Sequence, residues 1–177
     1  MPRIEFPVLA TSRLAPGYRE VIALVMWQIP ERFTERVQPH FLTGLDPAYV
    51  GLHRYHDTDS AVNVGRVLYS ETPHFASPHH QSLPKSQQHP TIVLPIPYTA
   101  FRREWGEDHI RRAIAHEFGH ALHAVLDEQP VFPPISEYAQ SNFHEAFAEA
   151  FECWMCDEDV VRELAPEAQA LFDRLWC

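Results

Sequence analysis

The sequence predicts an α+β fold with a small mixed sheet, a long helix beside its edge strand, and a C-terminal part made of helices. Three observations favour this class. A segment with helical periodicity stands near the start, short alternating or β-branched runs occupy the middle, and helix formers dominate after residue 107. Of the 177 residues, 45% are hydrophobic, so residues 1–177 are expected to form one domain with its own core.

The first half of the chain is expected to supply two helical segments and most of the sheet. Residues 17–29 carry apolar side chains at helical spacing, and Pro30 ends this helix and opens a shorter one that reaches residue 37. Residues 48–55 and 63–69 alternate in a way that is typical of strands. Residues 71–90 are rich in Pro, Ser, His and Gln and predict a loop.

Residues 91–96 form a β-branched run that Pro95 and Pro97 bring to an end. Proline lacks the backbone N–H that a strand ladder needs, so this run is expected to be an edge strand. An exposed edge can pair with an extended peptide through main-chain hydrogen bonds. Leu94 and Ile96 are therefore candidates for contact with a substrate, and ordinary sheet packing is the alternative.

A long helix is predicted for residues 107–126, with Asp108 as its N-cap. Gly119 costs this helix about 1 kcal/mol relative to alanine. Its missing side chain either lets another backbone or a substrate approach, or simply permits close packing. Further helices are predicted from Asn142 onward and for residues 159–165 and 166–176. The apolar stripe of the long helix comprises Ile110, Ala113, Ile114, Ala121, Leu122 and Val125.

The segment from His116 to His120 reads His-Glu-Phe-Gly-His and is an H-E-x-x-H motif inside that helix. Residues four apart share a helix face, so both imidazoles can point at one metal ion, and Zn²⁺ accepts such nitrogens at about 2.0–2.1 Å. Glu117 lies to the side and can reach a water at the metal without binding the metal. The chain has 12 histidines, so the alternative is a surface helix with solvated histidines.

A catalytic zinc site needs a third protein ligand, and the helix after Asn142 offers two carboxylates on one face. We assign Glu145 as the ligand and Glu149 as the carboxylate that orients a ligand histidine. The alternatives are a capping box between Asn142 and Glu145 and a solvated Glu149. His144 is a competing ligand, but its offset turns it away from the shared face. A separate stripe suited to the core comprises Phe143, Phe147, Phe151 and Trp154.

Together, HEFGHAL and the downstream pattern E-Y-A-x-S-N-x-x-E-x-F-A-E-A-F resemble the anthrax lethal factor-like zinc metallopeptidases, gluzincins that include the proline-proline endopeptidases. The likeness is clear over residues 114–151. It implies a zincin-like metallopeptidase fold in which His116, His120 and Glu145 bind one zinc ion per chain. The chain departs from the family in its short loop between the motifs and in Ala146, where an aromatic residue is common.

The resemblance also implies roles for three further residues. Glu117 would act as general base and acid, and Tyr138 would stabilise the oxyanion of the reaction; without the resemblance, Tyr138 is a half-buried aromatic in a loop. The resemblance also supports Glu149 as the carboxylate that orients a ligand histidine. The expected function is that of a zinc-dependent metalloendopeptidase acting on a peptide or protein. The alternatives are a non-catalytic metal-binding or interaction domain that retains the site, and a zinc amidase with a non-peptide substrate.

The composition and charge of the chain limit the classes of partner that we expect it to bind. A formal net charge of −10 and a pI near 5.6 argue against nucleic acid. No membrane is expected as a partner either, because no apolar run has the length of a transmembrane helix. A secretory signal is not seen, so we expect a cytoplasmic location or export by another route. Cleavage preference, oligomeric state and regulation stay open.

Cys153 and Cys156 could form a second metal or redox site, but ordinary reduced thiols are favoured. The histidine-rich loop could also bind a metal, but ordinary loop histidines are favoured there; they are His74, His79, His80 and His89.

Overall fold

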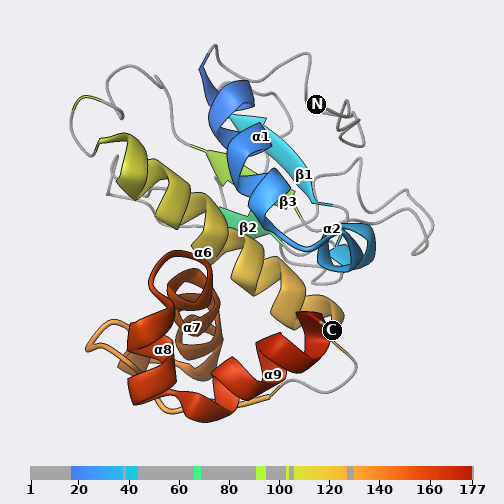
Figure 1. The fold of residues 1–177 in the computed structure, drawn as a ribbon. Helices are drawn as coiled ribbons and strands as arrows, with labels where there is room; N and C mark the ends of the chain where they lie inside the picture. The colour runs from blue at the N-terminus through green and yellow to red at the C-terminus, as the bar shows by residue number, and fades with distance from the viewer. Residues whose placement is uncertain are drawn as a thin grey trace.

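The computed structural model describes residues 17–37, 39–43, 66–68, 91–94, 103, 106–126 and 130–176. This part of the chain is mostly helical (Figure 1), so the predicted α+β class is wrong, and the described sheet is limited to three short strands. The strands have only four, three and four residues. Two strand residues whose side chains are described, Phe41 and Ile92, are buried. Within the described residues, the helices supply most of the buried core.

The first two helices follow the predicted pattern. Helix α1 (Tyr18–Gln28) begins after Gly17, whose φ of 97° is a conformation that glycine adopts without strain. Helix α2 (Glu31–Val37) starts where Pro30 offers its carbonyl to the amides of Phe33 and Thr34. One face of each helix is buried. The buried residues of α1 and α2 are Tyr18, Val21, Ile22, Val25, Met26, Phe33 and Val37.

Strands β1 (His40–Thr43), β2 (Arg66–Leu68) and β3 (Thr91–Leu94) are ordered β1-β3-β2. Strand β3 pairs in parallel with β1 and antiparallel with β2, so it is central among the described strands and the predicted edge strand is wrong. The reason is that Pro95 and Pro97 both follow the paired residues and leave every amide of β3 free for a ladder. The strand predicted for residues 48–55 lies outside the described residues.

Helix α6 (Glu107–Val125) is the long helix of Figure 1 and carries the H-E-x-x-H motif. Its N-cap is Gly106 and not Asp108, because the positive φ of Gly106 lets the chain turn into the helix two residues earlier than predicted. At the other end, the guanidinium of Arg36 donates hydrogen bonds to the carbonyl oxygen of Val125. This contact attaches α2 to the C-terminus of α6.

The remaining elements are the 3₁₀ helix η2 (Ala139–Ser141) and the helices α7 (Phe143–Cys156), α8 (Glu158–Leu164) and α9 (Pro166–Trp176). In Figure 1, α7 lies against α6, and α8 and α9 follow as the C-terminal part. Phe172 is fully buried where α9 meets α7. Its ring makes edge or tilted contacts with the rings of Phe132, Phe147, Phe151 and Trp154.

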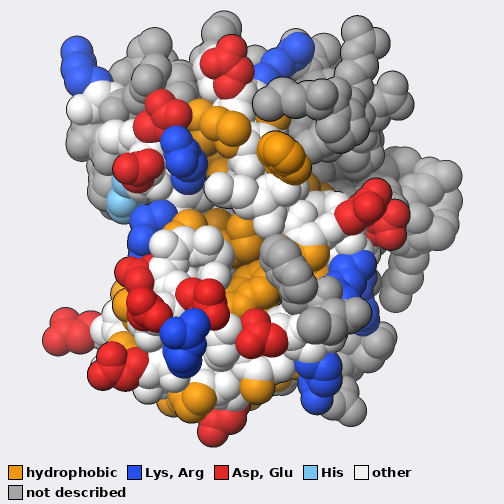
Figure 2. Space-filling view, viewed as in Figure 1, with side chains coloured by type: hydrophobic (Ala, Val, Ile, Leu, Met, Phe, Trp, Pro, Cys, Tyr) orange, Lys and Arg blue, Asp and Glu red, His pale blue; other side chains and the backbone are white. Residues whose placement is uncertain are grey.

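The predicted aromatic stripe of α7 is only partly a core stripe. Phe147 and Phe151 are fully buried, whereas Phe143 at the first turn is 40% exposed. On the face drawn in Figure 2, acidic side chains are spread over the C-terminal helices with arginines among them. Within the described residues, the helices lack the combination of length and apolar character that crossing a bilayer requires.

Candidate metal centre

The candidate site lies where helices α6 and α7 touch. A β-carbon placed on Gly119 would stand 2.9 Å from the Cα atom of Ala148 and 3.1 Å from the Cβ atom of Phe151. Only glycine permits helices this close. The approach brings the helix face that carries the two motif histidines next to the first turn of α7.

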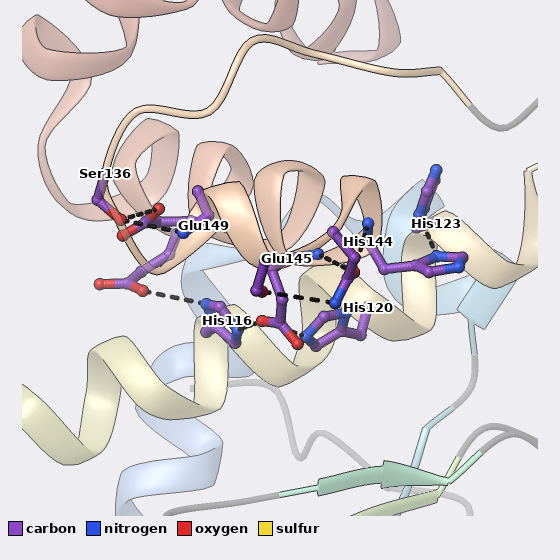
Figure 3. A network of polar contacts seen from close by, with 11 residues as sticks. His116, His120, His123, Ser136, His144, Glu145 and Glu149 are labelled. Atoms are coloured by element: carbon purple, nitrogen blue, oxygen red, sulfur yellow. Dashed lines mark hydrogen bonds and ion pairs between the residues drawn. The ribbon is translucent and has the colours of Figure 1, made fainter.

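Three side chains converge at this crossing (Figure 3). His116 Nε2 and His120 Nε2 lie 3.1 and 3.2 Å from the same oxygen, Oε2 of Glu145. The ligand atoms of the three residues all lie within 4.8 Å of one another, and in the described part of the chain they form the group suited to a metal ion. Their side chains are 12 to 19% exposed, so the group is sheltered but open to solvent.

The charges of these three groups are coupled. Burial favours neutral His116, but hydrogen bonds to Glu145 and Glu152 outweigh burial and raise its pKa to about 10. Burial, together with the positive charge of His116, lowers the pKa of His120. Burial would raise the pKa of Glu145, yet hydrogen bonds from both histidines hold it well below its usual range. The carboxylate of Glu145 is therefore ionised and available to a cation at neutral pH.

The position of Glu145 follows from the local sequence. Asn142 is the N-cap of α7, and its Oδ1 accepts hydrogen bonds from the backbone N–H groups of His144 and Glu145 at 2.9 and 3.1 Å. Glu145 is thus held in the first helical turn, where the helix dipole favours a negative charge. Half of the capping-box alternative is present, since Asn142 caps the helix. The Glu145 side chain points to the histidines.

Glu117 and Tyr138 border the same group. Glu117 follows His116 on α6, and its negative charge acts on both His116 and Tyr138. The Tyr138 ring centroid lies 6.1 Å from that of His116. Partial burial, followed by the charge and hydrogen bond of Glu145, raises the pKa of Tyr138 to about 12. The phenol therefore keeps its proton at neutral pH and can donate it in a hydrogen bond.

Glu149 is predicted to orient a ligand histidine, and its described partner is Ser136. Glu149 Oε2 accepts a hydrogen bond from Ser136 Oγ at 2.8 Å, and Ser136 Oγ in turn accepts one from the backbone N–H of Ala139 at 3.2 Å. Glu149 therefore fixes the loop that carries Tyr138. The carboxylate beside the other nitrogen of His116 belongs to Glu152, whose Oε2 lies 3.4 Å from His116 Nδ1.

Sequence reasoning missed Glu152, although a signal for it was present. Glu152 follows Glu145 by seven residues, which is two helical turns, and so lies on the same face of α7. A one-turn step to Glu149 and a two-turn step to Glu152 are both compatible with that face. The choice between them depends on the angle at which α7 crosses α6, and the sequence alone does not reveal this angle.

His144 takes no part in the three-residue group. Its Nδ1 lies 3.3 Å from Nδ1 of His123, on the side away from Glu149 (Figure 3). His123 is fully buried and stacks on Phe147 at 4.3 Å. Burial, then the charge of His144, lowers the pKa of His123 to about 4. This histidine is therefore a neutral part of the core.

The remaining candidates lie apart from this group or outside the described residues. Cys153 is buried and Cys156 is exposed, and both are free thiols. Burial and the charge of Glu152 raise the pKa of Cys153 to about 12, which is unfavourable for a reactive thiol. Leu94 is the last residue of the central strand β3. Ile96 and the loop histidines His74, His79, His80 and His89 lie outside the described residues.

Comparisons with protein-family models, curated proteins and solved structures gave no match to this chain. The resemblance to the lethal factor-like metallopeptidases therefore stays a prediction from the two motifs.

Proposed function

We propose that this protein is a zinc-dependent metalloendopeptidase that hydrolyses a peptide or protein substrate. The observation that carries the proposal is the approach of His116 Nε2 and His120 Nε2 to one oxygen of Glu145, at 3.1 and 3.2 Å. Glu117 and Tyr138 border the same group. A site that only bound metal would have no need of a base or a phenol there, so the set favours hydrolysis.

The donor atoms fit zinc. Two imidazole nitrogens and one carboxylate oxygen leave one position of a tetrahedral site open, as catalytic zinc requires. With bonds of about 2.0–2.1 Å, tetrahedral ligand atoms stand about 3.3 Å apart. The two nitrogen-to-oxygen distances, 3.1 and 3.2 Å, are close to that spacing.

Each residue then has a chemical task. When bound, zinc would supply a Lewis acid and lower the pKa of water at the site toward 7. Glu117 would take the proton of the attacking water and transfer it to the leaving amine. Tyr138, which keeps its phenol proton, would donate a hydrogen bond to the oxyanion that develops on the scissile carbonyl.

The test is cleavage of a random peptide mixture, followed by mass spectrometry. The protein should cleave peptides, lose this activity with a chelator and regain it when zinc is added. Glu117→Gln should still bind one zinc ion per chain and lose at least about 100-fold in rate, the usual size of a general-base contribution. Glu163→Gln, an exposed change on α8, is the matched control and should keep full activity.

The outcomes separate the alternatives. Full activity of Glu117→Gln would rule out the proposed base. Zinc binding without cleavage of any peptide would instead favour a non-catalytic metal-binding domain. Cleavage of small amides alone would favour an amidase.

A further inference from the structure

The ring of His116 faces a carboxylate on each side. Its Nε2 atom faces Glu145 Oε2 at 3.1 Å, and its Nδ1 atom faces Glu152 Oε2 at 3.4 Å. The two carboxylates come from α7, two helical turns apart. The ring of His116 therefore presents Nε2 to the candidate metal site and Nδ1 to Glu152.

Glu152 is itself held in place by a second residue of the metal-site helix. Arg112 Nε donates a hydrogen bond of 2.8 Å to Glu152 Oε1, the oxygen that does not face His116. Arg112 precedes His116 by four residues, so both side chains project from the same face of α6. Arg112, Glu152 and His116 therefore form a continuous chain of contacts between α6 and α7.

The Arg112 end of this series of contacts is open to solvent. Arg112 lines a cavity of about 370 Å³ between α1, α6 and α7, together with Gln28, Arg111 and Cys156. The side chain of Arg112 is 37% exposed, whereas that of Glu152 is 17% exposed. A substitution at Arg112 is thus tolerable for the fold, and the shielded carboxylate is the part that contacts the candidate ligand.

We propose that Glu152, held by Arg112, is the positioning residue that fixes the ring of His116 for metal binding. This proposal rests on the proposed metal centre. A carboxylate that accepts the Nδ1–H of a ligand histidine fixes the tautomer in which Nε2 carries the free lone pair, and it increases the basicity of that nitrogen. Arg112 keeps the carboxylate from turning away to solvent.

The test is the zinc affinity of the intact chain, measured by competition with a chromogenic chelator. Glu152→Ala should weaken zinc binding about 10- to 100-fold, the usual effect of losing such a partner. Glu152→Gln keeps an oxygen that can accept the Nδ1–H and should recover part of the loss. Glu149→Ala is the matched control, because Glu149 is a half-buried glutamate of the same helix whose described partner is Ser136. Its affinity should stay within about twofold of wild type, below the 10-fold that a true partner costs.

Arg112→Gln tests the chain of contacts. Alone it should weaken zinc binding several-fold, and in the Glu152→Ala background it should have no further effect, because Arg112 acts through Glu152. The melting temperatures of the metal-free variants report whether each variant folds. If Glu152→Ala folds and binds zinc as tightly as wild type, or if Glu149→Ala loses as much affinity, the proposal is wrong. If wild type itself binds no zinc, it is the metal centre that fails.

Discussion

Gly119 of α6 lies directly against Ala148 of α7, so close that a β-carbon at position 119 would stand 2.9 Å from the Ala148 Cα atom and 3.1 Å from its carbonyl oxygen. The sequence left two explanations open for this glycine: the approach of a substrate or backbone, or close packing. The atoms that approach are backbone atoms of Ala148, so Gly119 serves both the approach of another backbone and the close packing of the two helices. That packing also brings Glu145 within reach of the histidines.

Gly119→Ala should therefore destabilise the protein. Alanine gains about 1 kcal/mol in helix propensity over glycine. At this position it meets backbone atoms that cannot move aside, and overpacking costs about 1–3 kcal/mol. Urea unfolding should show a net loss, and zinc affinity should fall because the helices are forced apart.

Gly106→Ala is the control for this effect. A β-carbon there has no atom within 4 Å, so the substitution is strained only through its φ of +80°. It should cost stability without weakening zinc binding. A Gly119→Ala variant that is as stable as wild type would contradict the close approach of α6 and α7.

Removal of the third ligand should release the metal. Glu145→Ala is expected to weaken zinc binding by more than about 100-fold, since even the loss of an outer partner costs about 10- to 100-fold. Metal content by mass spectrometry is the measurement. His144→Ala is the control, because His144 is the neighbouring candidate whose ring lies beside His123 instead. One zinc per chain in Glu145→Ala, or none in His144→Ala, would reverse the ligand assignment.

The sequence predicted the parts of this site that depend on local spacing. The H-E-x-x-H helix and the position of Glu145 near the start of α7 follow from patterns within a few residues, and the Asn142 cap belongs to the capping-box alternative. The identity of the carboxylate that orients His116 does not follow from a local pattern, since the choice between Glu149 and Glu152 depends on how two helices cross. Crossing geometry arises from side-chain packing, here from Gly119, and no local pattern reports it.

The prediction of the fold class was wrong for a related reason. Alternation and β-branching in the middle of the chain predicted a sheet, but the described strands have at most four residues. The length of a strand depends on whether neighbouring segments continue the ladder, which is a non-local property. The prolines after Leu94 mark where β3 ends and say nothing about how many partners it has.

Tyr138→Phe should slow the reaction more than it weakens substrate binding. The phenol donates to charge that exists only in the transition state, so kcat should fall about 100- to 1000-fold with little change in KM. The pKa of Tyr138 is raised to about 12, so its proton is present throughout the neutral range and it should impose no limit on activity there. Steady-state kinetics on a single peptide found in the cleavage screen is the measurement. An unchanged kcat would give Tyr138 a structural role only.

His123 should make stability depend on pH in a defined window. Burial, then the charge of His144, lowers its folded pKa to about 4, while the unfolded value is about 6.5. Between these values the unfolded chain binds more protons, so stability is present above about pH 6.5 and is lost as pH falls toward 4. From pH 7.5 to pH 5 this histidine should account for about 2 kcal/mol of the decrease. His123→Phe keeps a ring to stack on Phe147 and should lose that part of the slope in urea unfolding with chelator present. Equal slopes in the two proteins would mean that His123 is protonated in the folded state.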